Sequence, residues 1–141
     1  MKLSIFILLL LPVSAGVWAT EITLQNGNWK LPANGAVTEF LTIQSEQDVR
    51  LSLAEAAIPV ASFRGGFAEL CGEYRTNRLR KSGRHPHGGK INLQWRTPDG
   101  KRHYAPHSLP EGDCDWTAFR LVGAIPDNAV DLRVQAGLQQ G

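Results

Sequence analysis

Hydrophobic and polar residues alternate with a period of two through most of this chain, and this pattern limits it to an all-β fold. The clearest runs are 91–96 and 130–136, in which every second residue is apolar. Such a run suits a strand with one face on a core and the other in water. Only Leu51–Ala57 leans towards a helix. The predicted strands are residues 21–25, 28–31, 37–43, 47–53, 67–76, 89–97, 101–106, 116–122 and 129–136.

Turn-forming residues separate these runs. Asn26-Gly27, Gly65-Gly66 and Gly88-Gly89 each fall between predicted strands, and Thr97–Lys101 contains the Pro-Asp-Gly sequence of a tight hairpin. Many short strands with frequent turns are typical of a β-sandwich or barrel. The chain has no internal repeat and no linker after residue 20, so we predict one β domain over residues 20–141.

Residues 1–19 read as a secretory signal peptide. Lys2 supplies a positive charge, Ile5–Leu11 is apolar, and small residues follow it. A membrane anchor would need roughly 18 apolar residues, so no membrane span is expected in the mature form. We expect cleavage after Ala19, or else after Ala15, and a secreted or periplasmic protein.

The charge of the chain argues against one broad class of partner. The formal net charge is +2, which is too small for general nucleic-acid binding. A basic loop runs from Arg78 to Gly89, but it contains no Phe, Tyr or Trp on which bases would stack. Its arginines would pair with acidic groups of a polysaccharide or else face water.

The two cysteines, Cys71 and Cys114, are candidates for a disulfide. An exported protein meets an oxidising environment, which favours such a bond. On the loop-entropy model the link would stabilise the fold by about 3–4 kcal/mol. Sequence spacing alone does not show that the two lie within reach, so two separate thiols are the alternative.

The order of segments from Phe67 to Gly141 resembles the galactose-binding-like family of jelly-roll carbohydrate-binding modules. No single motif carries this resemblance, which rests on five segments in sequence. They are the strand Glu69–Thr76, the glycine-led strand Gly89–Arg96 with its Asp99-Gly100 hairpin, the segment Gly112–Trp116, the corner at Pro126 and the strand Val130–Leu138.

The resemblance implies a jelly-roll β-sandwich that lacks its last strand. Members of the family continue past the position of Gly141 into a final strand that lies beside an N-terminal strand. Two interpretations stay open: the intact protein continues, with a covalently linked catalytic domain, or another chain pairs with the open edge. No cofactor is predicted, and the backbone ligands of a structural calcium ion are not readable from the sequence.

Polar positions of neighbouring strands are expected to form a ligand-binding face. Their amides, guanidinium groups and carboxylates have the geometry that sugar hydroxyls require. Trp29 and Tyr104 are free to stack under a sugar ring, whereas Trp95 is assigned to the core. Arg133 and Gln135, on a later strand, would extend the row of polar positions. An ordinary solvated sheet face is the alternative. The predicted ligand-binding residues are Glu73, Arg75, Arg78, Asn92, Gln94, Arg96 and Tyr104.

Metal binding and catalysis are not predicted. The histidines lack a carboxylate or cysteine at a metal-ligand spacing; they are His85, His87, His103 and His107. Glu111, Asp113 and Asp115 are neighbours on one segment, whereas glycosidases need two carboxyl groups across a cleft. The Gly-x-Ser-x-Gly motif is also absent.

Together these features favour a secreted, non-catalytic carbohydrate-binding module, accessory to or part of a glycoside hydrolase, with a polysaccharide or oligosaccharide as its partner. The alternative is a secreted structural or protein-interaction sandwich that pairs through an open sheet edge.

Overall fold

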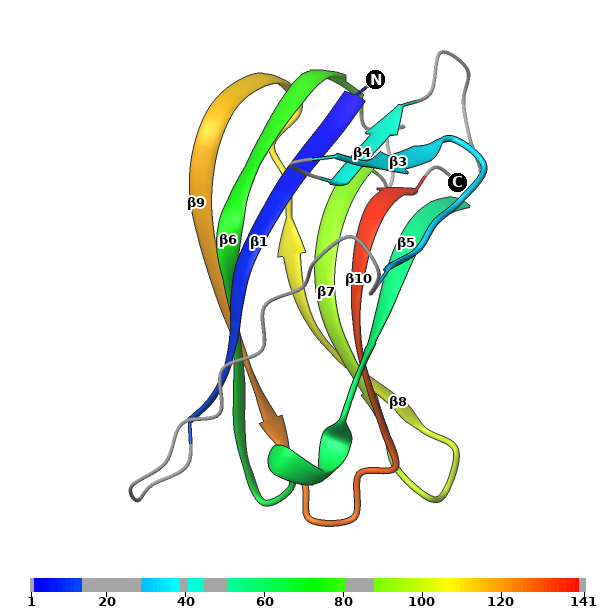
Figure 1. The fold of residues 1–141 in the computed structure, drawn as a ribbon, viewed down its shortest axis with the longest axis vertical. Helices are drawn as coiled ribbons and strands as arrows, with labels where there is room; N and C mark the ends of the chain where they lie inside the picture. Colours follow the sequence, from blue (N-terminus) through cyan, green and yellow to red (C-terminus); the bar gives the residue numbers. More distant parts are fainter. Residues whose placement is uncertain (1, 14–28, 39–40, 45–50, 81–87, 140–141) are drawn as a thin grey trace.

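The chain forms a sandwich of two five-stranded antiparallel sheets (Figure 1). The computed structural model describes residues 2–13, 29–38, 41–44, 51–80 and 88–139. Sheet A has the order β3-β4-β1-β6-β9 and sheet B the order β2-β5-β10-β7-β8. The strands are β1 (Lys2–Val13), β2 (Trp29–Lys30), β3 (Gly35–Val37), β4 (Leu41–Gln44), β5 (Leu51–Ile58), β6 (Gly66–Leu79), β7 (Gly88–Arg96), β8 (Arg102–Ser108), β9 (Gly112–Ile125) and β10 (Asp131–Gln139). One 3-10 turn, η2 (Val60–Ser62), follows β5.

The predicted alternation builds the core between the two sheets. Leu93 of β7 and Val134 of β10 face Leu70 of β6, and all three are fully buried. Their neighbours along each strand point to the outside of the sandwich, as a period of two requires. The all-β prediction is therefore confirmed, and it rests on this division between the inner and outer faces.

Most predicted strands are present, with shifted ends. The helical lean of Leu51–Ala57 was misleading, because this segment is β5 and pairs with β10 on one side and β2 on the other. Its core face consists of small or branched residues, including Ala54 and Ala56, which are fully buried. The segment Gly112–Trp116 lies inside β9, which therefore begins four residues before the predicted strand at 116–122. The predicted strand at 21–25 lies outside the described residues.

The hairpin between β7 and β8 has the predicted turn. Gly100 has a φ of 81°, in the left-handed region that glycine tolerates. Its N–H donates to the carbonyl of Thr97 at 2.9 Å, and the N–H of Thr97 donates to the carbonyl of Lys101 at 3.1 Å. Over the residues that the structure describes, no helix has the length and apolar character needed to cross a membrane.

The segment assigned to the signal peptide forms β1, the middle strand of sheet A. It pairs antiparallel with β6 over most of its length and with β4 at its start. Figure 1 shows this blue strand between β6 and β4. In the full chain, residues 2–13 therefore form the middle strand of sheet A. The sequence pattern instead assigned these residues to a signal peptide, which export would remove.

Candidate ligand-binding face

The outer face of sheet B carries a continuous row of polar side chains. Asn92 of β7 lies opposite Gln135 of β10, which in turn lies opposite Glu55 of β5. Two residues along β7, Gln94 lies between Arg133 of β10 and the edge strand β8. The row therefore crosses four strands of one sheet. We call this surface the polar face of sheet B, comprising Glu55, Asn92, Gln94, Tyr104, Arg133 and Gln135.

Two largely buried residues at the centre of this face carry side-chain amides that have no protein partner. Asn92 is 4% exposed and Gln94 is 6% exposed. Within the described part of the chain, neither side-chain amide makes a hydrogen bond to the protein, and His107 Nε2 is the one buried side-chain nitrogen or oxygen without a partner, so the amide atoms of Asn92 and Gln94 still reach solvent. Both amides therefore keep their donors and acceptors for a ligand.

Three of the four residues opposite these amides on the outer face are polar or aromatic, and the fourth is a proline. Asn92 lies opposite Gln135 and Pro106, and Gln94 lies opposite Arg133 and Tyr104. Aliphatic residues covering both amides would have counted against a sugar site. The observed surroundings instead supply further hydrogen-bonding groups and a ring.

A carboxylate fixes the side of the face formed by β10. Gln135 Nε2 donates to Glu55 Oε1 at 2.6 Å, and Arg133 Nη1 donates to Glu55 Oε2 at 3.4 Å. Arg133 Nε also donates to Asp131 Oδ2 at 2.8 Å. Because both long side chains are held by carboxylates, they lose little further freedom when a ligand arrives.

Sequence reasoning missed Glu55 and Asp131. Glu55 falls in the segment that leaned towards a helix, which hid its place in the alternation between Ala54 and Ala56. Asp131 stands at the first outward position of the final alternating run. Treating Leu51–Ile58 as a strand would have placed Glu55 on the polar side.

Tyr104 is the aromatic residue best placed on this face. It is 49% exposed and lies directly opposite Gln94. Trp29, the other aromatic residue expected to meet a ligand, is instead partly buried against the core. Its partner on β5 is the fully buried Ala56, so Trp29 lies on the inner side of the sheet.

Arg96 lies at one end of the polar face. It is exposed and stands opposite Asp131 of β10 and Arg102 of β8. Arg96, Asn92, Gln94 and Tyr104 are thus the predicted binding residues that the fold brings together on sheet B.

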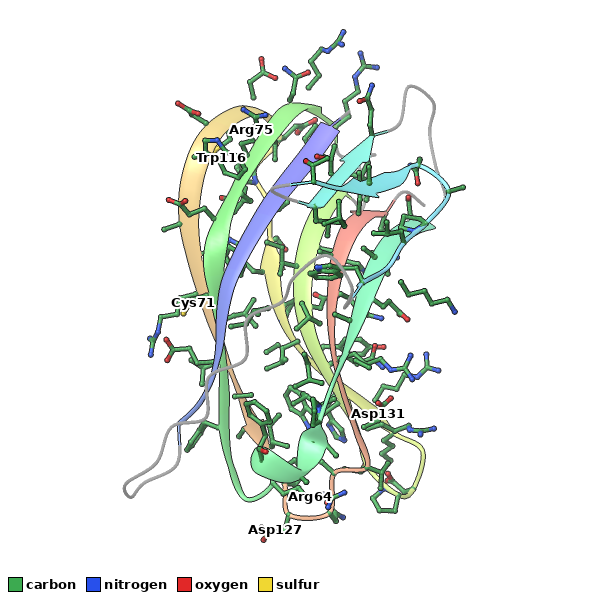
Figure 2. The ribbon with its side chains drawn as sticks, viewed as in Figure 1. Arg64, Cys71, Arg75, Trp116, Asp127 and Asp131 are labelled. Carbon is green, nitrogen blue, oxygen red and sulfur yellow. The ribbon has the colours of Figure 1, made fainter. Side chains whose placement is uncertain are left out.

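The remaining predicted binding residues lie elsewhere, which corrects the single-face prediction. Glu73 and Arg75 belong to β6, so they point outward from sheet A on the opposite side of the sandwich. The Arg75 guanidinium lies 5.0 Å from the ring centroid of Trp116. Figure 2 shows this pair beside β6 and β9, well away from Asp131 beside β10. Consecutive strands were assumed to share a sheet, but β6 and β7 do not.

Arg78 has a structural position at the end of β6. Its φ is 52°, the left-handed region, and its backbone N–H donates to Asp113 Oδ1 at 2.5 Å. The basic loop that follows, residues 81–87 with His85 and His87, lies outside the described residues.

The two cysteines are free, so of the two alternatives the structure has the separate thiols and not the candidate disulfide. Cys71 lies opposite Arg120, whereas Cys114 lies opposite Thr76, five residues further along β6. At about 3.4 Å per residue this separates them by roughly 17 Å, and a disulfide needs Cα atoms within about 7 Å. Sequence separation carried no information about this register.

Cys71 belongs to a small polar cluster on the outside of sheet A. Its thiol donates to Glu69 Oε1 at 3.1 Å, and Arg120 Nη2 donates to Glu69 Oε2 at 2.7 Å. The bond from Arg120, followed by the bond from Cys71, lowers the pKa of Glu69. Burial and the hydrogen bond to Glu69 raise the pKa of Cys71 to about 11. A thiol of this kind is a poor nucleophile at neutral pH.

The described residues offer no group of three or more His, Cys, Asp or Glu that is able to hold a metal ion. His103 stacks on Trp95, with ring centroids 5.8 Å apart. His107 packs among Tyr74 and Phe119, with centroids at 5.7 Å and 5.6 Å. His107 therefore packs within this ring cluster, whereas His103 is exposed and lies over Trp95.

A hollow of about 650 Å³ opens at one end of the sandwich, between the ends of β6, β7 and β9. Its wall includes the Trp95–His103 stack and Phe67, which is 50% exposed. Asp127 reaches over Gly65 at its rim. This hollow and the polar face of sheet B are separate surfaces, and only the polar face has adjacent amides on largely buried residues.

Comparison with protein-family models, with curated proteins and with solved structures finds no match to this chain. We therefore infer function from the fold and from the chemistry of the polar face of sheet B.

Proposed function

We propose that this protein is a non-catalytic carbohydrate-binding module that holds a polysaccharide or oligosaccharide on the polar face of sheet B. The observation that carries the proposal is the pair of side-chain amides without a protein partner, those of Asn92 and Gln94, beside the exposed ring of Tyr104. A primary amide both donates and accepts, so it matches a sugar hydroxyl in either role.

Each part of the face has a role in this proposal. The amides of Asn92 and Gln94, about 7 Å apart along β7, bind separate hydroxyls of the bound glycan. The ring of Tyr104 packs under the apolar face of one sugar unit, which aromatic side chains do at low entropic cost. Arg133 and Gln135, already held by Glu55, supply further donors. Rigid groups of this kind favour affinity because little order is lost on binding.

The wider setting of the proposal comes from the resemblance to the galactose-binding-like jelly-roll family. It implies an exported module that keeps a glycoside hydrolase near its polymer. Export also follows from the leader pattern of residues 1–19. Binding by the module itself needs no catalytic group.

Affinity electrophoresis of the folded full chain in gels containing soluble xylan, mixed-linkage β-glucan, galactan or pectin tests this function. Wild type should be retarded by at least one polymer. Gln94→Ala should lose most of that retardation, about tenfold in affinity (~1.4 kcal/mol).

Two matched variants locate the site. Arg75→Ala, on the outer face of sheet A, and Phe67→Ser, at the end hollow, should bind as wild type does. Equal retardation of Gln94→Ala and wild type would show that the polar face of sheet B is not the glycan site. A loss of retardation in Phe67→Ser alone would place the glycan site in the hollow. A glycan array without a positive spot would remove carbohydrate binding altogether.

A further inference from the structure

β1 fills a position in the middle of sheet A that two other strands define. Ile5 of β1 lies opposite Leu41 of β4 on one side and Tyr74 of β6 on the other. The pairing with β6 continues to Val13, which lies opposite Phe67. One segment of twelve residues therefore joins β3 and β4 to the rest of sheet A.

The same residues carry the features of a removable leader. Lys2, the apolar run Ile5–Leu11 and the small residues Ala15 and Ala19 are in the order that a signal peptidase recognises. Export would therefore remove the middle strand of sheet A. Residues 2–13 are able to act both as a strand of sheet A and as a removable leader only if another segment takes the place of β1 after cleavage.

The gap left by β1 does not close by simple collapse. β4 and β6 are each antiparallel to β1, so they are parallel to each other. They stand two strand spacings apart, roughly 9.6 Å, and would have to move by about 4.8 Å to pair. Such a pair would be parallel, while every described pair in this sandwich is antiparallel.

The gap is also apolar on its inner side. Leu41 and Ile43 of β4 are 3% and 0% exposed, and Leu70 and Tyr74 of β6 are 0% and 5% exposed. Removing β1 would bare these side chains, together with the backbone donors and acceptors of two strand edges. An edge of this kind readily accepts another strand.

We propose that the gap between β4 and β6 is a strand-acceptor site, which an extended, apolar segment of a partner polypeptide fills in the exported protein. The occupant runs antiparallel to β6 and spans about twelve residues, because β1 does so. Each other described strand already pairs within the sandwich, so none of them is spare to fill it. The predicted strand at 21–25 lies outside the described residues, and its five residues are fewer than the twelve of β1. The site works by β-strand addition. It rests on the export step of the proposed function and is independent of glycan binding.

The exported and the cytoplasmic forms of the full-length gene product provide the test. Intact mass shows whether residues 1–19 have been removed from the exported form, while the cytoplasmic form retains them. The probe is a fluorescent peptide of residues 2–13 flanked by lysines for solubility. The control peptide carries proline in place of Ile5, Ile7 and Leu9, which removes backbone donors.

The exported form should bind the probe saturably, and hydrogen exchange at β4 and β6 should slow when it does. The cytoplasmic form, whose site is already filled, and the proline peptide should each bind at least tenfold more weakly. Glycan retardation is measured on the same samples. If the exported form is still retarded by glycan but does not bind the probe, the strand-acceptor site is wrong and the proposed glycan binding stands.

A second design covers an exported form that fails to fold. The cytoplasmic full chain receives a protease site within residues 14–28 and is folded before it is cut. Labelled probe should then replace the cut segment over time. The proposal is overturned if the cut segment never exchanges, if the exported protein retains residues 2–13, or if its β4 and β6 amides are protected without any peptide.

Discussion

Gln135 of β10 lies directly opposite Glu55 of β5, and its Nε2 donates to the Glu55 carboxylate across 2.6 Å. Arg133 donates to the other oxygen of the same carboxylate. Residues 80 positions apart in the chain thus form the framework of the polar face of sheet B.

Replacing Glu55 tests whether the framework positions the ligand groups. Glu55→Ala should weaken glycan binding about fivefold (~1 kcal/mol), because Arg133 and Gln135 lose their shared acceptor. Glu55→Gln keeps one acceptor oxygen and should lose less. Isothermal titration with the polymer identified by electrophoresis measures both. Equal effects of the two variants would mean that charge, and not positioning, is the contribution of Glu55.

Tyr104 is expected to contribute its ring to binding and little to stability. Because it is 49% exposed, Tyr104→Ala should shift Tm by less than about 3 °C. The same change should weaken glycan affinity about tenfold (~1.4 kcal/mol). Tyr104→Phe keeps the stacking surface and should bind nearly as wild type. A loss as large in Tyr104→Phe would assign the effect to the hydroxyl group.

His107 makes stability depend on pH in a defined direction. Burial lowers its pKa from the ordinary value of 6.5, so below that value the unfolded chain takes up a proton more readily than the folded one. Its contribution to stability is complete above about pH 6.5 and declines as the pH falls towards and through the folded-state pKa.

His107→Phe should remove this pH dependence. The variant fits the ring cluster of Tyr74 and Phe119, and it eliminates a buried Nε2 without a hydrogen-bond partner. We expect a gain of about 1 kcal/mol at pH 8, which widens as the pH is lowered to 5. Urea unfolding at each pH measures it, and parallel curves for the two proteins would contradict the assignment.

Gly137 should tolerate no side chain. A Cβ there would overlap the backbone carbonyl of Ser52 and press on Leu53 Cα at 2.9 Å. Gly137→Ala should therefore cost about 3 kcal/mol. At Gly123 the nearest atom is Cζ3 of the Trp95 side chain, at 2.8 Å. Gly123→Ala should cost less because that ring is able to shift. Calorimetric Tm values in the reverse order would contradict this account.

The cysteines should be two free thiols of unequal reactivity. Burial and the hydrogen bond to Glu69 raise the pKa of Cys71 to about 11, so Cys71 should alkylate slowly at pH 8. Cys114 should be labelled first. Timed iodoacetamide treatment followed by peptide mass spectrometry gives both rates. A Cys71–Cys114 peptide in unreduced protein would instead show that the register of β6 and β9 is wrong.

Local patterns predicted most of the described strands, but they assigned β1 to a signal peptide and gave β3 and β4 as one strand over 37–43. The alternation at Ile91–Arg96 placed Asn92 and Gln94 on one side of a strand and Leu93 on the other, and the structure agrees. The Asp99-Gly100 turn was predictable because a positive φ at that position suits glycine. The boundaries moved by a few residues, because strand ends depend on the length of the partner strand.

The candidate site was predictable only in part. Asn92, Gln94, Arg96 and Tyr104 come together because they share β7 and its hairpin partner β8. Glu73 and Arg75 were assigned to the same surface, and they lie on the other side of the sandwich.

The sequence by itself determined which side chains of each strand face the core, because that choice depends on neighbours one or two positions away. Only the tertiary structure decided which sheet each strand joins. That choice depends on backbone pairing between distant segments, such as β10 between β5 and β7. It placed Glu55 beside Gln135, left Cys71 far from Cys114, and put residues 2–13 in the middle of sheet A.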